Sequence, residues 1–384
     1  MQNVALEGGP VEVVGALDLD HSPTGLVPRR LPAWTRPQIP DLFMDVVVQL
    51  PSGVRLRFAT TSTCIELDVM LTNLSRPPMP QMAAVFDLVI DGEVVAQQQS
   101  TEGHLIILGP NGPADISFAA GEPTTLTFED LPSGMKVVEI WLPQASGVEL
   151  RSLRIEDGAS TEAAAPDPAP YWVHYGSSIS HCIEATSPTA TWPAVAAHQA
   201  GVKLHSLGLA GQCMLDQFVA RTIADLPADV ISLKVGINVV NGDTLRERTF
   251  GPALHGFLDT IRAKQPDTPI LLVSPIFCPS AEDRPGPTIP NAEGNYITVD
   301  GLEDLRLTCL TLNKIRTSIS SIVDVRRGLG DTNLHYLNGL ELFGVDDAGD
   351  LHDDLHPTAA GYVRIGQRFA ELAFGAGGPL ASAG

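Results

Sequence analysis

Apolar and polar positions partly alternate over the first 155 residues, in short runs separated by turn-forming residues. This two-residue period is typical of strands that bury one face. Asp91-Gly92 lies between two such runs and favours a two-residue hairpin turn. Because no long helical period appears, the pattern predicts a β-sandwich or jelly roll. The expected strand segments are 53–71, 82–97, 124–128, 136–142 and 148–155.

The pattern changes twice after these strands. Residues 156–170 hold Ala, Pro and acidic residues without a large apolar side chain, which predicts a linker. From Tyr171 onward, apolar strand patterns alternate with helical patterns, and this predicts a parallel sheet with helices on both faces. We therefore expect a β-domain over 1–155, a linker over 156–170 and an α/β domain over 171–384. The expected strands are 172–175, 203–209, 230–235, 269–277 and one that begins at 322–324; the expected helices are 189–199, 214–226, 252–264, 302–320 and 359–374.

Composition narrows the class of protein. The chain has 384 residues, of which 44% are hydrophobic, and this argues against intrinsic disorder and allows two domains. Lys and Arg number 24 against 45 Asp and Glu, so the net charge of −21 argues against nucleic-acid partners and anionic membrane surfaces. No CxxC pair, signal peptide or membrane-spanning run is visible, so we expect a cytoplasmic protein without disulfides or structural zinc. The sequence carries no signal for an oligomeric state.

A serine-rich segment follows the first predicted strand of the α/β domain. The strand at 172–175 runs into Gly176-Ser-Ser-Ile-Ser180 and then into a predicted helix. A serine at such a turn can be exposed at the top of a parallel sheet, and its own amide can donate to an oxyanion. The alternative is an ordinary serine-rich helix cap.

Two further loops follow predicted strands. Gly211 lies in Leu-Gly-Leu-Ala-Gly-Gln, where a glycine lets the backbone N–H come close to a ligand. Asn238 lies in Lys-Val-Gly-Ile-Asn, where its side-chain amide can donate to an oxyanion. Taken singly, each segment favours an ordinary turn over an oxyanion donor.

The segment Asp-Asp-Leu-His-Pro precedes the last predicted helix. His356 can act as a base and then as an acid near neutral pH, and Asp353 can fix its tautomer from the same loop. His352 and His356 also loosely match the HExxH zinc motif. Pro357, however, favours a position of His356 before the helix, so we expect no metal. The acidic stretch 346–354 could also be a solvated loop.

These pieces occur in the order Ser, Gly, Asn and Asp-x-x-His, each at a predicted carboxyl-end loop. As a set, they resemble the SGNH (GDSL-type) hydrolase superfamily over about residues 171–375. The resemblance implies a flavodoxin-like α/β fold and a serine nucleophile served by a triad and an oxyanion hole. The triad that it implies is Ser178, Asp353 and His356, and the oxyanion donors are the amides of Ser178 and Gly211 and the side chain of Asn238.

The sequence departs from that family's pattern at two positions. Ser177 stands where the motif has Asp. That position is not itself catalytic, so the catalytic residues that the resemblance implies stay the same. Val239 stands where Asp often follows the Asn, which loosens the support around Asn238 without removing its donor.

The order of a β-domain and this α/β domain is similar to the two-domain acyltransferases of actinomycete polyketide tailoring. That resemblance implies transfer of an acyl or aryl group from a CoA thioester to a hydroxyl of a polyketide, through an acyl-serine. Acyl-CoA would be a donor substrate, and no cofactor is implied. A GDSL-type esterase or deacetylase acting on small or carbohydrate esters stays open, because both reactions use the same residues. A non-enzymatic binding protein would require the motif set to be accidental.

Other residues near the motifs have simpler expected roles. The long Pro-rich stretch 278–301 predicts either a lid or binding loop or a solvated surface excursion. Cys182 and Cys213 lie close to the motif blocks, and we expect them to be inert packing residues. The tryptophans are expected mostly in the core.

Overall fold

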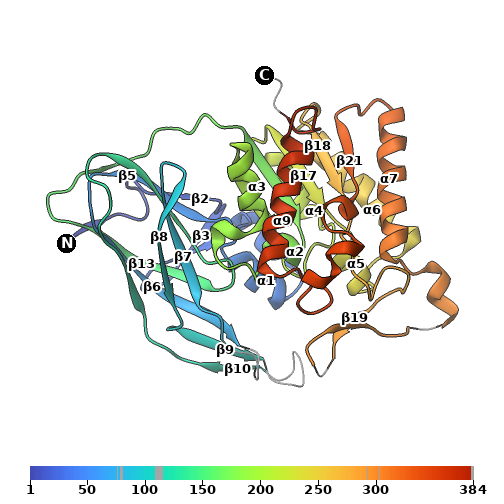
Figure 1. The fold of residues 1–384 in the computed structure, drawn as a ribbon, viewed down its shortest axis with the longest axis horizontal. Coiled ribbons are helices and arrows are strands. Elements are labelled where there is room, and N and C mark those ends of the chain that lie inside the picture. The colour runs from blue at the N-terminus through green and yellow to red at the C-terminus, as the bar shows by residue number, and fades with distance from the viewer. Residues whose placement is uncertain (76, 78–80, 109–115, 292, 302, 382–384) are drawn as a thin grey trace. The chain divides into compact units, whose positions relative to one another are not determined.

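The computed structural model describes the chain apart from residues 76, 78–80, 109–115, 292, 302 and 382–384 (Figure 1). It divides into two compact units. The N-terminal unit comprises Met1–Pro168 with Thr186–Thr189, and the C-terminal unit comprises Ala169–Ala185 with Ala190–Gly384.

The N-terminal unit consists of two sheets around one hydrophobic core, as the alternating pattern predicts. Phe58 and Phe86 of one sheet and Leu67 and Leu153 of the other are fully buried in this core. In the described residues, one sheet contains β1 (Gln2–Val4), β3 (Asp18–His21), β4 (Leu26–Arg29), β6 (Ile65–Ser75), β9 (His104–Leu108), β10 (Ile116–Ala119), β11 (Thr124–Phe128) and β13 (Gly147–Ile155). The other contains β2 (Glu12–Val14), β5 (Arg55–Thr60), β7 (Ala84–Ile90), β8 (Glu93–Ser100), β12 (Lys136–Trp141) and β14 (Thr161–Glu162).

The predicted hairpin turn joins β7 and β8. Asp91 and Gly92 have φ angles of 51° and 89°, the left-handed values that a two-residue turn between twisted strands requires.

Two features of this unit differ from the prediction. Helix α1 (Leu42–Gln49) forms where no helix was expected, after the 3₁₀ turn η1 (Ala33–Gln38). Asp41 caps α1, which buries Met44, Val47 and Val48 on one face, so packing outweighs the strand preference of its valines. The expected linker 156–170 begins as part of this unit, because β14 pairs with β5.

The C-terminal unit contains a five-stranded parallel sheet with the order β16-β15-β17-β18-β21, which is the flavodoxin-like order. The first strand of this sheet in sequence, β15, therefore lies between β16 and β17. In such sheets, ligands gather beyond the carboxyl ends of the strands at this point, where the strand order reverses. The strands are β15 (Tyr171–Gly176), β16 (Lys203–Gly208), β17 (Val230–Lys234), β18 (Ile270–Val273) and β21 (Leu334–Leu337).

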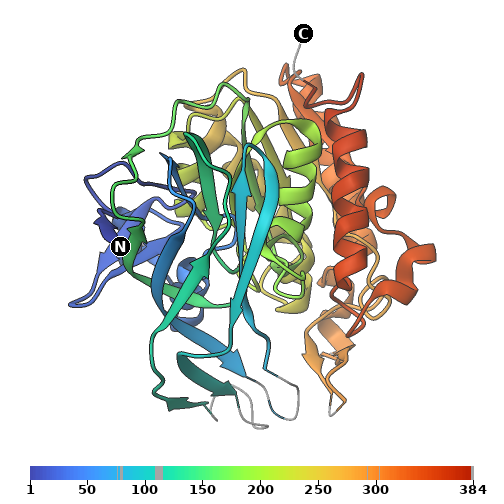
Figure 2. The same ribbon diagram turned by 60° about the vertical axis from the view of Figure 1, so that its left-hand side comes forward.

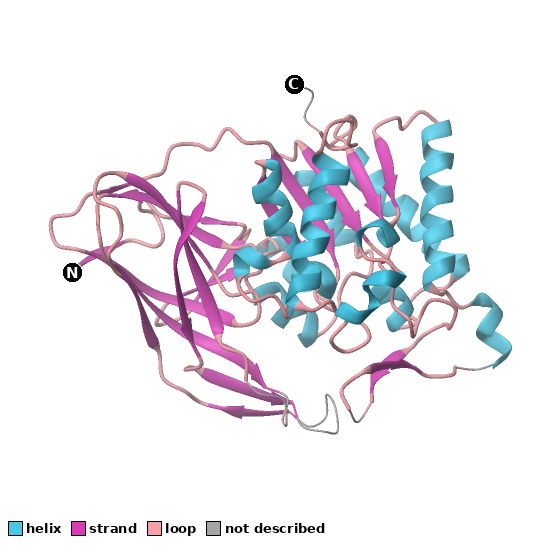
Figure 3. Cartoon of the chain, in the orientation of Figure 1, coloured by secondary structure: helices cyan, strands magenta, loops and turns pink. Residues whose placement is uncertain are grey.

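Helices cover both faces of this sheet (Figure 3). Trp172 and Tyr175 point to opposite faces of β15, where Trp172 stacks on Phe369 of α9 and Tyr175 stacks on Phe257 of α6. Helices α3 and α9 lie side by side on one face (Figure 2). The helices are α2 (Ser178–His181), α3 (Trp192–Ala200), α4 (Gln217–Asp225), α5 (Ile237–Asn241), α6 (Glu247–Arg262), α7 (Leu312–Gly328), α8 (Gly339–Leu342) and α9 (Ala359–Phe369), with η3 (Pro188–Ala190), η4 (Glu303–Thr308), η5 (Val345–Asp350) and the π-turn η6 (Ala370–Phe374).

The strand expected to begin at 322–324 was wrong, because these residues lie within α7. Ile315, Ile319, Ile322 and Val323 are buried along one face of that helix, a spacing that suits a helix rather than a strand. The strand at this place in the order is β21, which begins at Leu334, twelve residues after Ile322. Helix α6 also begins earlier than expected, at Glu247, with Pro252 inside it.

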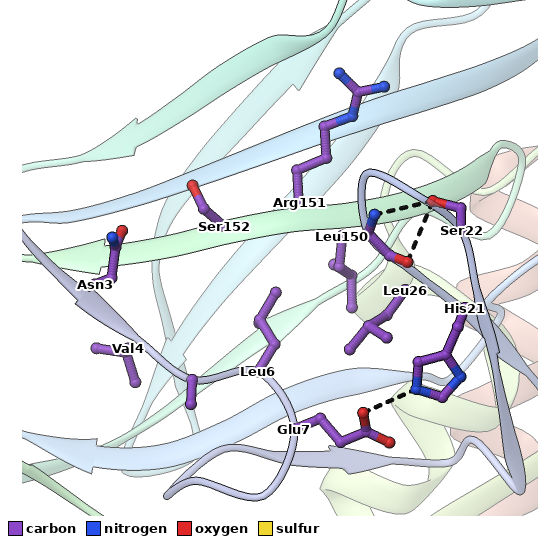
Figure 4. A pocket seen from close by; sticks show the side chains of 12 residues that line it. Asn3, Val4, Leu6, Glu7, His21, Ser22, Leu26, Leu150, Arg151 and Ser152 are labelled. Carbon is purple, nitrogen blue, oxygen red and sulfur yellow. Dashed lines mark hydrogen bonds and ion pairs between the residues drawn. The ribbon is translucent and has the colours of Figure 1, made fainter.

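A shallow pocket of about 430 Å³ lies on the N-terminal unit (Figure 4). Apolar side chains that include Leu6 and Leu150 form part of its wall, and His21 pairs with Glu7 at 2.9 Å beside them. Its described lining contains no Trp, Tyr or Phe. Within the described chain, no helix is both long enough and apolar enough to cross a bilayer.

Candidate active site

The serine-rich segment forms a tight strand-to-helix turn after β15. Ser177 caps α2 by accepting a hydrogen bond from the Ile179 amide at 3.3 Å, and Ser178 is the first residue of the helix. Gly176 must be glycine, because a Cβ there would collide with Ser180 Oγ. Ser177 and Ile179 are buried, whereas Ser178 is partly exposed. The turn therefore presents the Ser178 hydroxyl at the carboxyl edge of the sheet.

Ser178, His356 and Asp353 form one hydrogen-bonded chain. His356 Nε2 lies 2.9 Å from Ser178 Oγ, and His356 Nδ1 lies 2.7 Å from Asp353 Oδ2. Burial alone would raise the pKa of the Asp353 carboxyl, but its hydrogen bonds with His356 and the charge of that ring lower it below its usual value. An ionised Asp353 favours the tautomer in which Nδ1 carries the proton and Nε2 accepts from the serine.

A compact loop before α9 holds this histidine and aspartate. Leu351 pairs with Pro357 in an isolated bridge, and the His352 amide donates to the His356 carbonyl at 2.9 Å. Asp353 Oδ1 also accepts the His356 amide at 2.6 Å. His356 precedes the helix, as expected, although Pro357 lies just outside the first turn, which Thr358 caps. Among the residues that the structure describes, no group of three or more His, Cys, Asp or Glu side chains is arranged to hold a metal.

The two other predicted loops end neighbouring strands of the same sheet. Gly176 at the end of β15 is in register with Gly208 of β16 and with Lys234 of β17, so the loops that follow begin side by side. Gly211 has a φ of 69°, a left-handed conformation that glycine adopts without strain. Asn238 is buried in the first turn of α5.

One hydrogen bond orients the Asn238 side chain. Its Oδ1 accepts the Cys213 amide at 3.0 Å, which ties the Asn238 turn to the loop that carries Gly211. Since the oxygen is used in this way, the Nδ2 group is the donor that the side chain can offer to a ligand. The structure therefore brings the loops of Ser178, Gly211 and Asn238 to one edge of the sheet.

Sequence reasoning missed two side chains next to His356. The tyrosine ring of Tyr296 meets the imidazole edge to face, with centroids 5.5 Å apart, and its amide donates to the Asp353 carbonyl at 2.8 Å. Glu184, in the loop after α2, places Oε1 3.9 Å from His356 Nδ1. The available signal for Tyr296 was the Pro-rich stretch that contains it; no local pattern marks Glu184.

That Pro-rich stretch carries a small hairpin of β19 (Thr288–Pro290) and β20 (Tyr296–Thr298). Its base is fixed by the Thr298 hydroxyl, which donates to the Ser280 carbonyl at 2.5 Å, and by the Val299 amide, which donates to the Pro287 carbonyl at 2.9 Å. Part of the stretch therefore contacts the candidate site.

The buried cysteines near the site are poor nucleophiles. Burial raises the pKa of the Cys213 thiol to about 12 and that of Cys182 well above its usual value. Both therefore stay protonated at neutral pH, which agrees with a packing role.

A second serine–histidine pair lies behind the first. Ser180 Oγ is 2.8 Å from His174 Nε2, and His174 Nδ1 is 2.7 Å from the hydroxyl of Ser232. Both His174 and Ser180 are fully buried. Burial, and then the charge of Lys234, lower the pKa of His174 to about 3, so its ring is neutral.

Comparison with known proteins agrees with this fold. Residues 171–280 match the GDSL-like Lipase/Acylhydrolase family. The chain resembles the SGNH (GDSL-type) hydrolase superfamily in sequence and fold, and this resemblance supports an enzyme, either an acyltransferase or a carboxylic ester hydrolase. No curated protein sequence matches the chain.

Solved structures of similar fold cover both units. The Salicylyl-Acyltransferase SsfX3 from a tetracycline biosynthetic pathway is 28% identical, with a TM-score of 0.79 over 96% of this chain and 95% of that one. The sequence resemblance to a salicylyl transferase, drawn from the GSSIS block and the two-domain order, agrees with this structural similarity. A Bacteroides ovatus protein described as a GDSL-like lipase is 19% identical, with a TM-score of 0.64 over 94% of each chain. An active-site mutant of a Clostridium thermocellum family two carbohydrate esterase is 13% identical, with a TM-score of 0.57 over 83% of this chain and 90% of that one.

Proposed function

We propose that the protein is a serine-dependent acyltransferase. It moves an acyl group, with an aryl group as the first candidate, from a CoA thioester to a hydroxyl of a polyketide natural product. The observation that supports this proposal most directly is the hydrogen-bonded chain from Ser178 through His356 to Asp353. Its geometry suits removal of the serine proton during nucleophilic attack.

The first half-reaction forms an acyl-enzyme. His356 Nε2 takes the Ser178 proton while Oγ attacks the thioester carbonyl. The oxyanion accepts hydrogen bonds from the amides of Ser178 and Gly211 and from Asn238 Nδ2. When the tetrahedral intermediate collapses, the C–S bond breaks and the thiolate leaves with the proton that His356 holds. An ionised Asp353 stabilises the imidazolium during this step.

The second half-reaction passes the acyl group to the acceptor. His356 takes the proton of the acceptor hydroxyl, whose oxygen attacks the acyl carbonyl and forms the new ester. Ser178 leaves and recovers its proton from His356. The donor is a substrate rather than a cofactor, and these steps use no metal.

The choice of donor and acceptor rests on the structural relative. SsfX3 is a salicylyl acyltransferase, and this chain is similar to it along nearly the whole of both chains. Transfer requires that a bound alcohol outcompete water at the acyl-serine. The hairpin that places Tyr296 against His356 covers part of the site and would help to exclude water there.

Ester hydrolysis is the second candidate, because the matched family is one of lipases and acylhydrolases. The triad and the oxyanion donors would be the same, with water as the acceptor. For the carbohydrate-ester version, the described lining of the pocket of the N-terminal unit contains no Trp, Tyr or Phe on which a sugar ring could stack.

A product assay separates the two candidates. The full chain is incubated with salicylyl-CoA or other acyl-CoA donors and a polyhydroxylated polyketide acceptor, and the products are read by mass spectrometry. We expect an acylated acceptor from the wild-type protein and none from Ser178→Ala. Hydrolysis alone at saturating acceptor would overturn the transferase proposal in favour of the esterase.

A further inference from the structure

A second carboxylate lies beside the histidine of the triad. Glu184 Oε1 is 3.9 Å from His356 Nδ1, the same nitrogen that pairs with Asp353 Oδ2 at 2.7 Å. Glu184 is too far from Nδ1 to share its proton, so its effect on the ring is one of charge rather than of hydrogen bonding. The side chain is largely shielded from water, with 21% of it exposed, so solvent screens this charge only in part.

Tyr362 fixes the position of Glu184. The tyrosine lies in α9, is fully buried, and donates its hydroxyl proton to Glu184 Oε2 at 2.8 Å. Burial, and then the charge of Glu184, raise the pKa of Tyr362 well above its usual value, so the hydroxyl remains a donor. The two oxygens of Glu184 thus have different partners: Oε2 is held by the tyrosine and Oε1 faces the imidazole.

Asp353 and Glu184 both place a carboxylate oxygen within 4 Å of His356 Nδ1. The Tyr296 ring and the Ser178 hydroxyl are neutral neighbours. His352 is a nearby group that can carry a positive charge; its ring centroid is 6.4 Å from that of His356, and its Nε2 is 3.8 Å from Asp353 Oδ2. The buried Cys182 thiol beside Glu184 stays protonated.

We propose that Glu184 is a positioning residue that acts through His356, as a second carboxylate that stabilises the imidazolium and sets the pH range of serine activation. An opposite charge within about 4–6 Å favours the charged form of a titratable group. Glu184 therefore makes His356 a stronger base when Ser178 gives up its proton. No bond to Glu184 forms or breaks. This inference rests on the proposed function, because it needs Ser178 to be the nucleophile.

The test is the rate at which a fluorophosphonate labels Ser178 in the full chain, measured from about pH 5 to pH 9. Labelling requires the unprotonated imidazole, so the rate falls on the acidic side. For Glu184→Gln, we expect the midpoint of this fall to move about 0.5–1 pH unit lower. The rate above the midpoint should also fall several-fold, because the imidazole is a weaker base. Tyr362→Phe keeps the ring and releases Glu184, so it should move the midpoint in the same direction by less.

The matched control is Glu371→Gln, which removes one exposed carboxylate from the turn that follows α9 and should leave the profile unchanged. Thermal unfolding of each variant confirms that it is folded. A midpoint in Glu184→Gln equal to that of the control, whether or not the rate falls, would overturn the inference. Absence of Ser178 labelling in the wild-type protein at every pH would instead overturn the proposed function, and this inference with it.

Discussion

The short helix α2 carries the serines of two serine–histidine pairs, and the hydrogen bonds of the two pairs are nearly equal in length. Ser178 at its start is 2.9 Å from His356, and Ser180 two residues later is 2.8 Å from His174. The front pair, Ser178 and His356, lies at the edge of the sheet. The rear pair, Ser180 and His174, is fully buried.

The two histidines differ in the group that supports Nδ1. In the rear pair this group is the neutral hydroxyl of Ser232, and burial holds the pKa of His174 at about 3. A ring that cannot take up a proton near neutral pH cannot act as a general base. In the front pair, the group is the carboxylate of Asp353. Charge support and access to solvent, rather than hydrogen-bond distance, therefore distinguish a candidate catalytic pair from a structural one.

Removing each serine in turn gives the largest expected contrast. Ser178→Ala should lower kcat for a model ester by roughly four to six orders of magnitude, because the proposed nucleophile is lost. Ser180→Ala should retain activity but lower the free energy of unfolding by about 1–3 kcal/mol, because a buried His174 nitrogen loses its partner. Ester turnover and denaturant unfolding measure the two effects. Equal losses of activity would contradict the contrast between the pairs.

Replacing the supporting groups is the next test. Asp353→Asn should lower kcat by about 10⁴-fold, because the amide favours the wrong tautomer of His356. Ser232→Ala should leave kcat close to that of the wild type and lower stability, since both His174 and the indole N–H of Trp172 bond to that hydroxyl. A pH profile of kcat for both variants checks the prediction. A large loss in Ser232→Ala with unchanged stability would count against a purely structural rear pair.

The sequence predicted the front pair through its resemblance to the SGNH (GDSL-type) superfamily, whose motif set falls on predicted strand-end loops in this chain. The carboxyl ends of parallel strands meet at one edge of a sheet, so Ser178, Gly211 and Asn238 could be grouped without coordinates. The approach of Glu184 to His356 could not be predicted in this way. Its partner Tyr362 lies 178 residues further along the chain, and only the packing of α9 joins the two.

The strand preference of a few neighbouring residues also led to one wrong element in the prediction. Ile322 and Val323 have β-branched side chains that favour a strand when read over a few residues. Their burial together with Ile315 and Ile319 places them on a helix face, a pattern that becomes clear only over the full length of α7.

A third prediction tests whether the front pair also has its oxyanion donor. Asn238→Ala should lower kcat by about 10²–10³-fold with little change in KM, because Nδ2 is proposed to donate to charge that develops in the transition state. The matched control is Asn338→Ala. Asn338 follows β21 and caps α8 through the Leu340 amide at 3.1 Å, so its loss should cost about 1 kcal/mol of stability and leave kcat unchanged. Comparable kinetic losses in the two variants would argue against the proposed role of Asn238.

The last prediction concerns the charge behind the rear pair. Lys234 is 1% exposed, its ammonium has no hydrogen-bond partner among the described residues, and its charge helps to keep His174 neutral. Burial lowers the pKa of Lys234 from 10.5 to about 8. The folded protein therefore binds this proton less tightly than the unfolded chain does, a difference of ~3 kcal/mol. That penalty is fully present below pH 8 and is relieved between about pH 8 and 10.5.

Lys234→Met should consequently raise the free energy of unfolding at pH 7 by up to ~3 kcal/mol and remove the rise between pH 8 and 10.5 that this lysine contributes. Lys264→Met is the control, because Lys264 is 63% exposed in a surface ion pair and should change stability by less than about 1 kcal/mol. Denaturant unfolding of both variants at pH 7 and pH 10 measures the difference. A lower free energy of unfolding for Lys234→Met at pH 7 would contradict this prediction. It would mean that the buried positive charge stabilises the region around the rear pair, as the Asp353 carboxylate supports the front pair.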